Sequence, residues 1–96
     1  MTLREKYNTQ ELLKGIRESD EEIISYIYAS FFSATESYIL RNSGGAEEAR
    51  DIFQDALLVI FNLGRENRLS LSTTFGGFLY SVSRLLWLKE LRKTNL

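Results

Sequence analysis

The chain has 96 residues, 44% of them hydrophobic, and a net charge of −1, which fits a single small globular domain spanning residues 1–96. It contains no cysteine and no histidine, so disulfides, thiolate chemistry and the commonest general base are excluded. No apolar run approaches the ~18 residues of a membrane span, and the N-terminus lacks the apolar core of a signal peptide. We therefore expect a cytoplasmic protein with no membrane segment.

The charges are unevenly distributed along the chain. Residues 1–60 carry 6 Lys and Arg against 11 Asp and Glu, a balance of −5. Residues 61–96 carry 6 against 2, a balance of +4. The basic C-terminal part indicates an anionic partner, although a small solvated surface can also show such a split by chance.

Hydrophobic periodicity predicts the all-α fold class. Apolar residues recur at three- and four-residue spacing, proline is absent, and no strand-like alternation is present. We expect a compact bundle of about four helices over residues 9–18, 20–42, 46–63 and 75–93. The expected start signals are Asn8 with Glu11, Ser19 with Glu22, and Thr74, and the expected stop signals are Gly44 and Gly64.

The helix expected over residues 46–63 has an apolar face and an acidic face. On a helical wheel the apolar face holds Ala49, Ile52, Phe53, Ala56, Ile60 and Leu63. The opposite face holds Glu47, Glu48, Asp51, Gln54, Asp55 and Leu58. A leucine framed by acids resembles an interface anchor inside a polar rim. The alternative is an ordinary solvated acidic face.

The acids of this helix do not indicate a metal or catalytic site. Asp51 and Asp55 lie one turn apart and could share a cation, but di-iron helical bundles also need histidines, which the chain lacks. Serines, tyrosines and carboxylates are present, yet no base and nucleophile pair is recognisable. We expect no catalytic residue, no metal and no cofactor, and hence no enzyme.

The helix expected over residues 75–93 is apolar on two faces. One face holds Phe75, Phe78, Leu79, Val82 and Leu86, and the other holds Tyr80, Arg84, Trp87 and Leu91. The second face could stack exposed bases while Arg92 and Lys93 meet phosphates. Alternatively, the helix is sandwiched between two others, with Trp87 packed on the first helix. Gly76 and Gly77 would let another backbone or a flipped base approach the helix start.

Two segments resemble a known family. The run AEEARDIFQDALLVIF resembles the helix with which bacterial RNA polymerase sigma factors bind the polymerase clamp, and FLYSVSRLLWLKELRK resembles the helix that follows it. The likeness covers nearly the whole chain and is strongest to region 2 of the small extracytoplasmic-function type. The matching residues are Glu47, Glu48, Ala49, Asp51, Ile52, Gln54, Leu58, Leu79, Val82, Arg84, Arg92 and Lys93. Leu85 and Lys89 depart from the usual Asn and Asp, and Leu85 offers a base only apolar contact.

The resemblance implies two binding surfaces. The clamp coiled coil of core RNA polymerase would bind Glu47, Asp51, Gln54, Asp55 and Leu58. Promoter DNA, mainly the separated non-template strand, would bind Leu69, Ser70, Leu71, Ser72, Ser81, Arg84, Leu85, Leu88 and Arg92. Within that set, the loop Leu69 to Ser72 would capture a base flipped from the minus-ten element, and Arg92 would hold phosphates.

The resulting expectation is a non-enzymatic transcription initiation factor domain that binds core RNA polymerase and the melted minus-ten element. An inhibitory anti-sigma protein is a further partner of such domains, and the sequence leaves it open. The family's second, upstream-element-binding domain is not expected here, since no residues follow Leu96. The alternative is a helical protein-protein interaction or dimerisation module without nucleic-acid binding, which would bury Trp87 and Tyr80 against a partner or a second copy.

Overall fold

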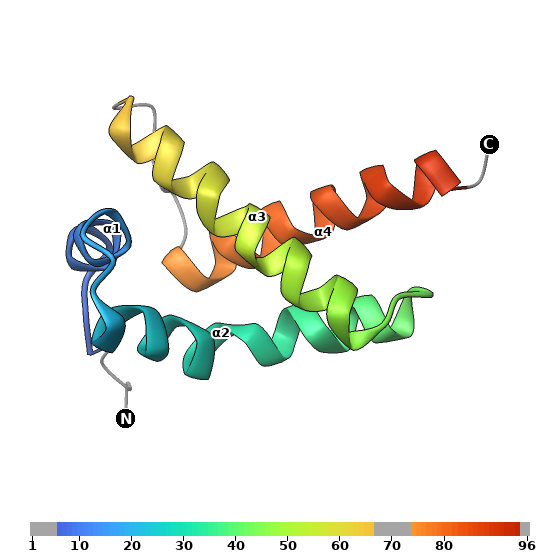
Figure 1. The fold of residues 1–96 in the computed structure, drawn as a ribbon, viewed down its shortest axis with the longest axis horizontal. Helices are drawn as coiled ribbons and strands as arrows, with labels where there is room; N and C mark the ends of the chain where they lie inside the picture. Colours follow the sequence, from blue (N-terminus) through green and yellow to red (C-terminus); the bar gives the residue numbers. More distant parts are fainter. Residues whose placement is uncertain (1–5, 67–73, 95–96) are drawn as a thin grey trace.

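A computed structural model describes residues 6–66 and 74–94, and this part of the chain is all-α (Figure 1). Its helices are α1 (Thr9–Arg17), α2 (Glu21–Arg41), α3 (Ala46–Arg65) and α4 (Phe75–Thr94). These bounds confirm the expected helical bundle to within two residues at each end. α3 packs against each of the other three helices and crosses in front of α4 in the view of Figure 1.

The capping box expected before α1 is present. The Glu11 N–H donates to Asn8 Oδ1 over 2.8 Å, and the Asn8 N–H donates to Glu11 Oε1 over 2.9 Å. Each side chain therefore satisfies a backbone N–H that the first helical turn leaves without a carbonyl partner.

The start of α2 differs from the expectation by one residue. Ser19 is not the N-cap, because it adopts a left-handed φ of 53° that terminates α1. The N–H groups of Ser19 and Asp20 donate to the carbonyls of Ile16 and Gly15, which closes α1 in a Schellman arrangement. Asp20 then caps α2 through Oδ1, which accepts from the Glu22 N–H over 3.0 Å.

The turn between α2 and α3 uses Gly44 for space. Ser43 takes the left-handed conformation, with φ of 73°, and the Gly44 N–H donates to the Ile39 carbonyl over 2.9 Å. A Cβ on Gly44 would clash with the Ile39 side chain and lie 2.7 Å from Trp87 Cζ2. Gly44 therefore marks the end of α2, as predicted, and does so by allowing close packing.

Gly64 does not end α3, which continues to Arg65. A Cβ on Gly64 would lie 3.5 Å from Leu13 of α1, so the position also borders that helix. At α4 the expected N-cap is confirmed, since the Gly77 N–H donates to Thr74 Oγ1 over 3.0 Å.

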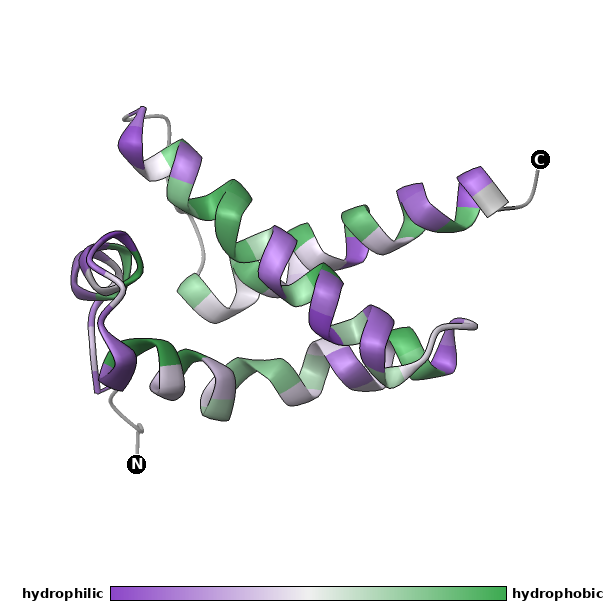
Figure 2. Cartoon of the chain, in the orientation of Figure 1, coloured by the Kyte–Doolittle hydropathy of each residue, from purple (hydrophilic) through white to green (hydrophobic). Residues whose placement is uncertain are grey.

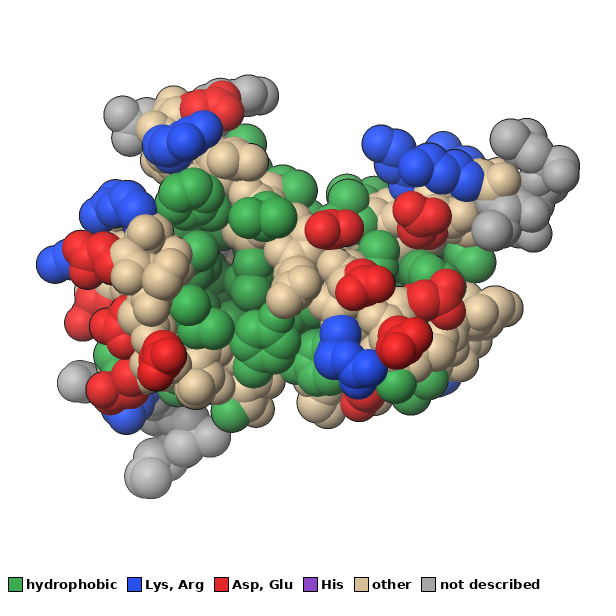
Figure 3. Space-filling view, viewed as in Figure 1, with side chains coloured by type: hydrophobic (Ala, Val, Ile, Leu, Met, Phe, Trp, Pro, Cys, Tyr) green, Lys and Arg blue, Asp and Glu red, His purple; other side chains and the backbone are tan. Residues whose placement is uncertain are grey.

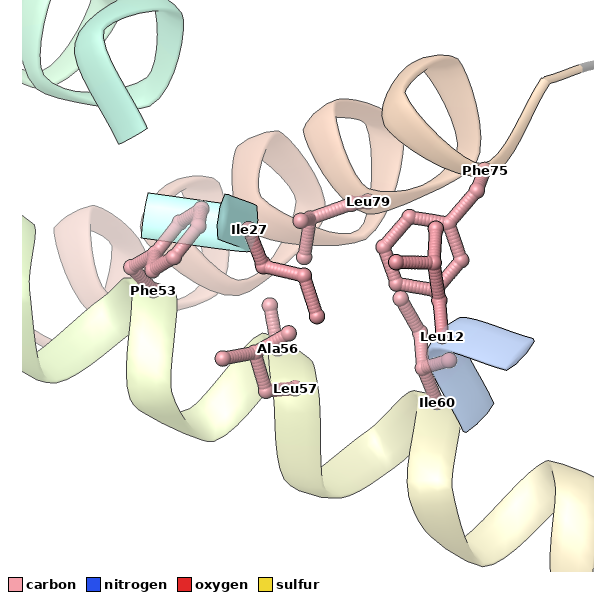
Figure 4. Packing of buried hydrophobic residues seen from close by; sticks show 8 residues of the cluster. All are labelled: Leu12, Ile27, Phe53, Ala56, Leu57, Ile60, Phe75 and Leu79. Atoms are coloured by element: carbon pink, nitrogen blue, oxygen red, sulfur yellow. The ribbon is translucent and has the colours of Figure 1, made fainter. Parts of the chain in front are cut away.

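The core consists of two clusters that α3 joins. The larger one, shown in Figure 4, contains Leu12, Ile27, Phe53, Ala56, Leu57, Ile60, Phe75 and Leu79. The smaller one contains Ile39, Ala49, Ile52 and Trp87. Both clusters draw residues from α2, α3 and α4, and only the larger one includes α1. The position and tilt of α3 are therefore determined along most of its length.

Hydropathy along the helices follows this packing. Figure 2 shows α3 as mainly hydrophilic on the facing side of its N-terminal half and mainly hydrophobic in the middle of the helix. Within residues 6–66 and 74–94, no helix combines the length and apolar character needed to cross a membrane.

Candidate docking face and nucleic-acid surface

The residues expected to bind the polymerase all lie at the surface of α3. Glu47, Asp51, Gln54, Asp55 and Leu58, which we call the docking face, are exposed. Ala49, Ile52, Phe53, Ala56 and Ile60 on the opposite side are buried, so the two-faced character of this helix is confirmed. Leu57, which the helical wheel left out of the core stripe, is also buried. Figure 3 shows the carboxylates gathered over the N-terminal half of α3.

Leu58 is 58% exposed and stands beside an apolar groove. The groove has a volume of about 360 Å³ and lies between α1, α2 and α3. Its lining residues are Ile16, Ile24, Tyr28, Gln54, Asp55, Leu57 and Leu58. Hydrophobic side chains line the hollow between α1 and α3 in Figure 3. Leu58 is therefore part of a concave apolar surface with a polar rim, which is the form of a protein-binding site.

A second hollow lies on the other side of the docking face, between α3 and α4. It has a volume of about 310 Å³ and is lined by Glu48, Asp51, Ile52, Asp55, Trp87 and Glu90. Its four carboxylates favour a partner with basic side chains. Asp55 lines both hollows, so one partner surface laid along α3 would meet apolar groups on one side and acids on the other. In the part of the chain that the structure describes, no group of three or more acids is arranged to hold a metal ion.

The residues expected to follow the DNA strand lie along α4. Ser81, Arg84, Leu85 and Arg92 are exposed, whereas Leu88 is half-buried. Leu85 is 66% exposed, so an apolar side chain occupies the surface at this position. Figure 3 shows basic side chains over the C-terminal half of α4. The expected base-capture loop Leu69 to Ser72 lies outside the described residues.

Trp87 corrects one expectation about α4. It is 3% exposed, and its indole N–H donates to the Asn42 carbonyl over 2.9 Å. It packs with Ile39 of α2 and with Ala49 and Ile52 of α3, not on the first helix. α4 is thus sandwiched between α2 and α3. Trp87 is therefore not free to stack on a base or to anchor a second copy of the chain.

Gly76 corrects a second expectation. A Cβ at this position would lie 2.5 Å from Cε1 of Phe31, an aromatic residue of α2. The space left by the missing side chain at position 76 is therefore occupied by a ring of the same chain. Neither a flipped base nor another backbone has access to that place.

Sequence reasoning did not predict four of the residues that lie at these surfaces. Ile16, Ile24 and Tyr28 line the apolar groove, and Tyr38 lies beside Tyr80 with ring centroids 6.0 Å apart. Along the sequence they read as core positions, because each belongs to an apolar stripe. One sequence signal could have revealed them: the apolar side chains of α2 cover a wider arc of the helix than packing on a single face requires.

Comparison of the chain with protein-family models, with curated proteins and with solved structures found no match. The resemblance to sigma factors therefore depends on the sequence motifs alone.

Proposed function

We propose that this chain is a transcription initiation factor domain of the sigma type. It binds core RNA polymerase through the docking face of α3 and contacts the melted minus-ten promoter element through α4. The observation that carries the proposal is Leu58, a leucine 58% exposed on an acidic helix and standing at an apolar groove. The motif around it, from Glu47 to Leu58, is the segment that resembles the clamp-binding helix.

The energetics favour a partner with apolar and basic side chains at this face. Burying a leucine fully is worth about 1.5–3 kcal/mol, so covering the exposed part of Leu58 contributes roughly 1–2 kcal/mol. Extending the contact into the groove adds Ile16, Ile24 and Tyr28, which are half-buried in the chain alone. The surrounding carboxylates orient a basic partner and speed its approach more than they add affinity. A coiled coil that presents apolar and basic side chains has the required chemistry.

The DNA-binding role is proposed for the exposed positions of α4. Arg84 and Arg92 would meet backbone phosphates, and Leu85 would pack against an unstacked base without reading its edge. No bond is made or broken in this role. RNA polymerase binding also implies that the protein acts in the cytoplasm, where an anti-sigma protein would compete for the docking face.

Capture of bacterial core RNA polymerase on the immobilised full chain tests the proposal. Wild type is expected to retain the polymerase, whereas Asp55→Arg and Leu58→Glu are expected to lose it. The matched control is Leu40→Glu, because Leu40 is 53% exposed on α2 and lies outside the docking face and the groove. Equal capture by wild type and by both docking-face variants would overturn the proposal.

The alternative function, an interaction or dimerisation module without nucleic-acid binding, is favoured by one observation. Three large hydrophobic side chains, Leu40, Leu58 and Leu85, are more than half exposed, at 53%, 58% and 66%. Analytical ultracentrifugation distinguishes it from the main proposal. A tight dimer that Leu58→Glu dissociates would favour the alternative, because self-association would then cover the docking face.

A further inference from the structure

Arg84 is held against two tyrosines from different helices. Its guanidinium carbon lies 5.2 Å from the ring centroid of Tyr38 on α2 and 5.8 Å from that of Tyr80 on α4. The two rings meet edge to face, with centroids 6.0 Å apart and an interplanar angle of 76°. Both tyrosines are half-buried, so the packing of α2 on α4 fixes them in place.

The aromatic contacts leave the hydrogen-bonding capacity of Arg84 available. A guanidinium is attracted to the π face of an aromatic ring, and this contact does not occupy the N–H groups, which point outward in the plane of the guanidinium. Among the described residues no acidic side chain pairs with Arg84, whereas Lys93 in the last turn of α4 pairs with Glu90 at 3.8 Å. Arg84 is therefore a positioned cation at the surface that has no carboxylate partner within residues 6–66 and 74–94, a combination that suits a bidentate contact with a phosphate.

We propose that Tyr38 and Tyr80 form a platform that orders Arg84 for a backbone phosphate of single-stranded DNA, so that Tyr38 is a positioning residue of the nucleic-acid surface. The inference rests on the proposed function, which assigns α4 to the melted strand. It extends the surface to α2, a helix on which the sequence predicts no binding residue. Holding the long arginine side chain in place before the ligand arrives lowers the entropy lost on binding.

The test uses the full chain mixed with core RNA polymerase and a fluorescently labelled single-stranded oligonucleotide carrying a minus-ten sequence. Arg84→Ala is expected to weaken binding about tenfold and to reduce the salt slope by about 0.7, the value for one phosphate contact on a single strand. Tyr38→Leu is expected to weaken binding about two- to fivefold with an unchanged slope, because no charge is removed. Tyr38→Phe keeps the ring and is expected to bind like wild type.

A double variant separates positioning from a merely structural effect. If Tyr38 acts through Arg84, adding Tyr38→Leu to Arg84→Ala weakens binding no further. Additive losses, or wild-type affinity in Tyr38→Leu while Arg84→Ala is impaired, would overturn the inference and leave the proposed function standing. Failure of the wild-type complex to bind the oligonucleotide would overturn the DNA-binding role and this inference with it.

Discussion

Replacing Gly44 by alanine tests how tightly the turn between α2 and α3 is packed. The added Cβ would lie 2.7 Å from Cζ2 and 2.9 Å from Cη2 of Trp87, and against the side chain of Ile39. Ile39 is fully buried and Trp87 is 3% exposed, so neither has open space into which it can move. The indole is also held by its hydrogen bond to the Asn42 carbonyl. The variant must therefore displace core side chains or open the turn.

The expected change in stability follows from two opposing effects. Inserting a methyl group into a packed core costs about 1–3 kcal/mol. The smaller backbone entropy of alanine in the unfolded chain offsets about 0.4–1 kcal/mol of that. The net loss in free energy of unfolding is roughly 1–2 kcal/mol. For a domain of this size it corresponds to a fall in Tm of between about 4 and 16 °C.

Thermal unfolding followed by circular dichroism measures this loss. Gly45→Ala is the matched control, because a Cβ on Gly45 would meet only Glu48 Oε1 at an ordinary 3.7 Å. Its Tm is expected to stay within a few degrees of wild type. If Gly44→Ala melts at the wild-type temperature, Ile39 and Trp87 yield without cost, and close packing at this turn does not require Gly44.

Two further predictions concern α2 and the chain before α1. Thr35 is 1% exposed, and its Oγ1 has no hydrogen-bond partner among the residues that the structure describes. Thr35→Val is therefore expected to raise the free energy of unfolding, measured by urea titration, by about 1 kcal/mol, and an unchanged or lower value would contradict this. The Tyr7 hydroxyl donates to Glu22 Oε1 over 2.9 Å. This hydrogen bond is the largest cause that raises the Tyr7 pKa above 10.0, and desolvation and the negative charges of Glu22, Asp20 and Glu11 raise it further. The resulting stabilisation is complete below pH 10.0 and is lost as the pH rises through the folded-state pKa. In urea titrations at alkaline pH, the free energy of unfolding of wild type should therefore fall more steeply with pH than that of Tyr7→Phe. Equal pH slopes for the two proteins would count against the hydrogen bond.

Most of the fold could be predicted because its signals are local. Apolar spacing located all four helices of the described residues, and Asn8 and Thr74 were recognisable as caps. One error arose where two local signals compete, and the other where a tertiary contact decides. Ser19 looks like an N-cap, yet it adopts the left-handed conformation that ends α1. Gly64 looks like a stop signal, yet α3 passes through it beside Leu13.

The candidate site could be predicted only as single helical faces. A wheel shows that Leu58 points away from the core of α3, and the structure agrees. It cannot show that Ile16 and Tyr28 extend the apolar surface beside Leu58, because that depends on how α1 and α2 sit against α3. The contact of Arg84 with Tyr38 was missed for the same reason, since the two residues are joined only by helix packing.

The location of Trp87 provides a built-in optical probe. It is the only tryptophan of the chain, and it lines the hollow together with Glu48, Asp51, Asp55 and Glu90. A basic side chain entering that hollow would change the electric field at the indole and shift its emission. Titrations with short peptides that lack tryptophan can therefore follow occupancy of the hollow without attaching a dye, and Leu58 can be varied independently to measure the neighbouring groove.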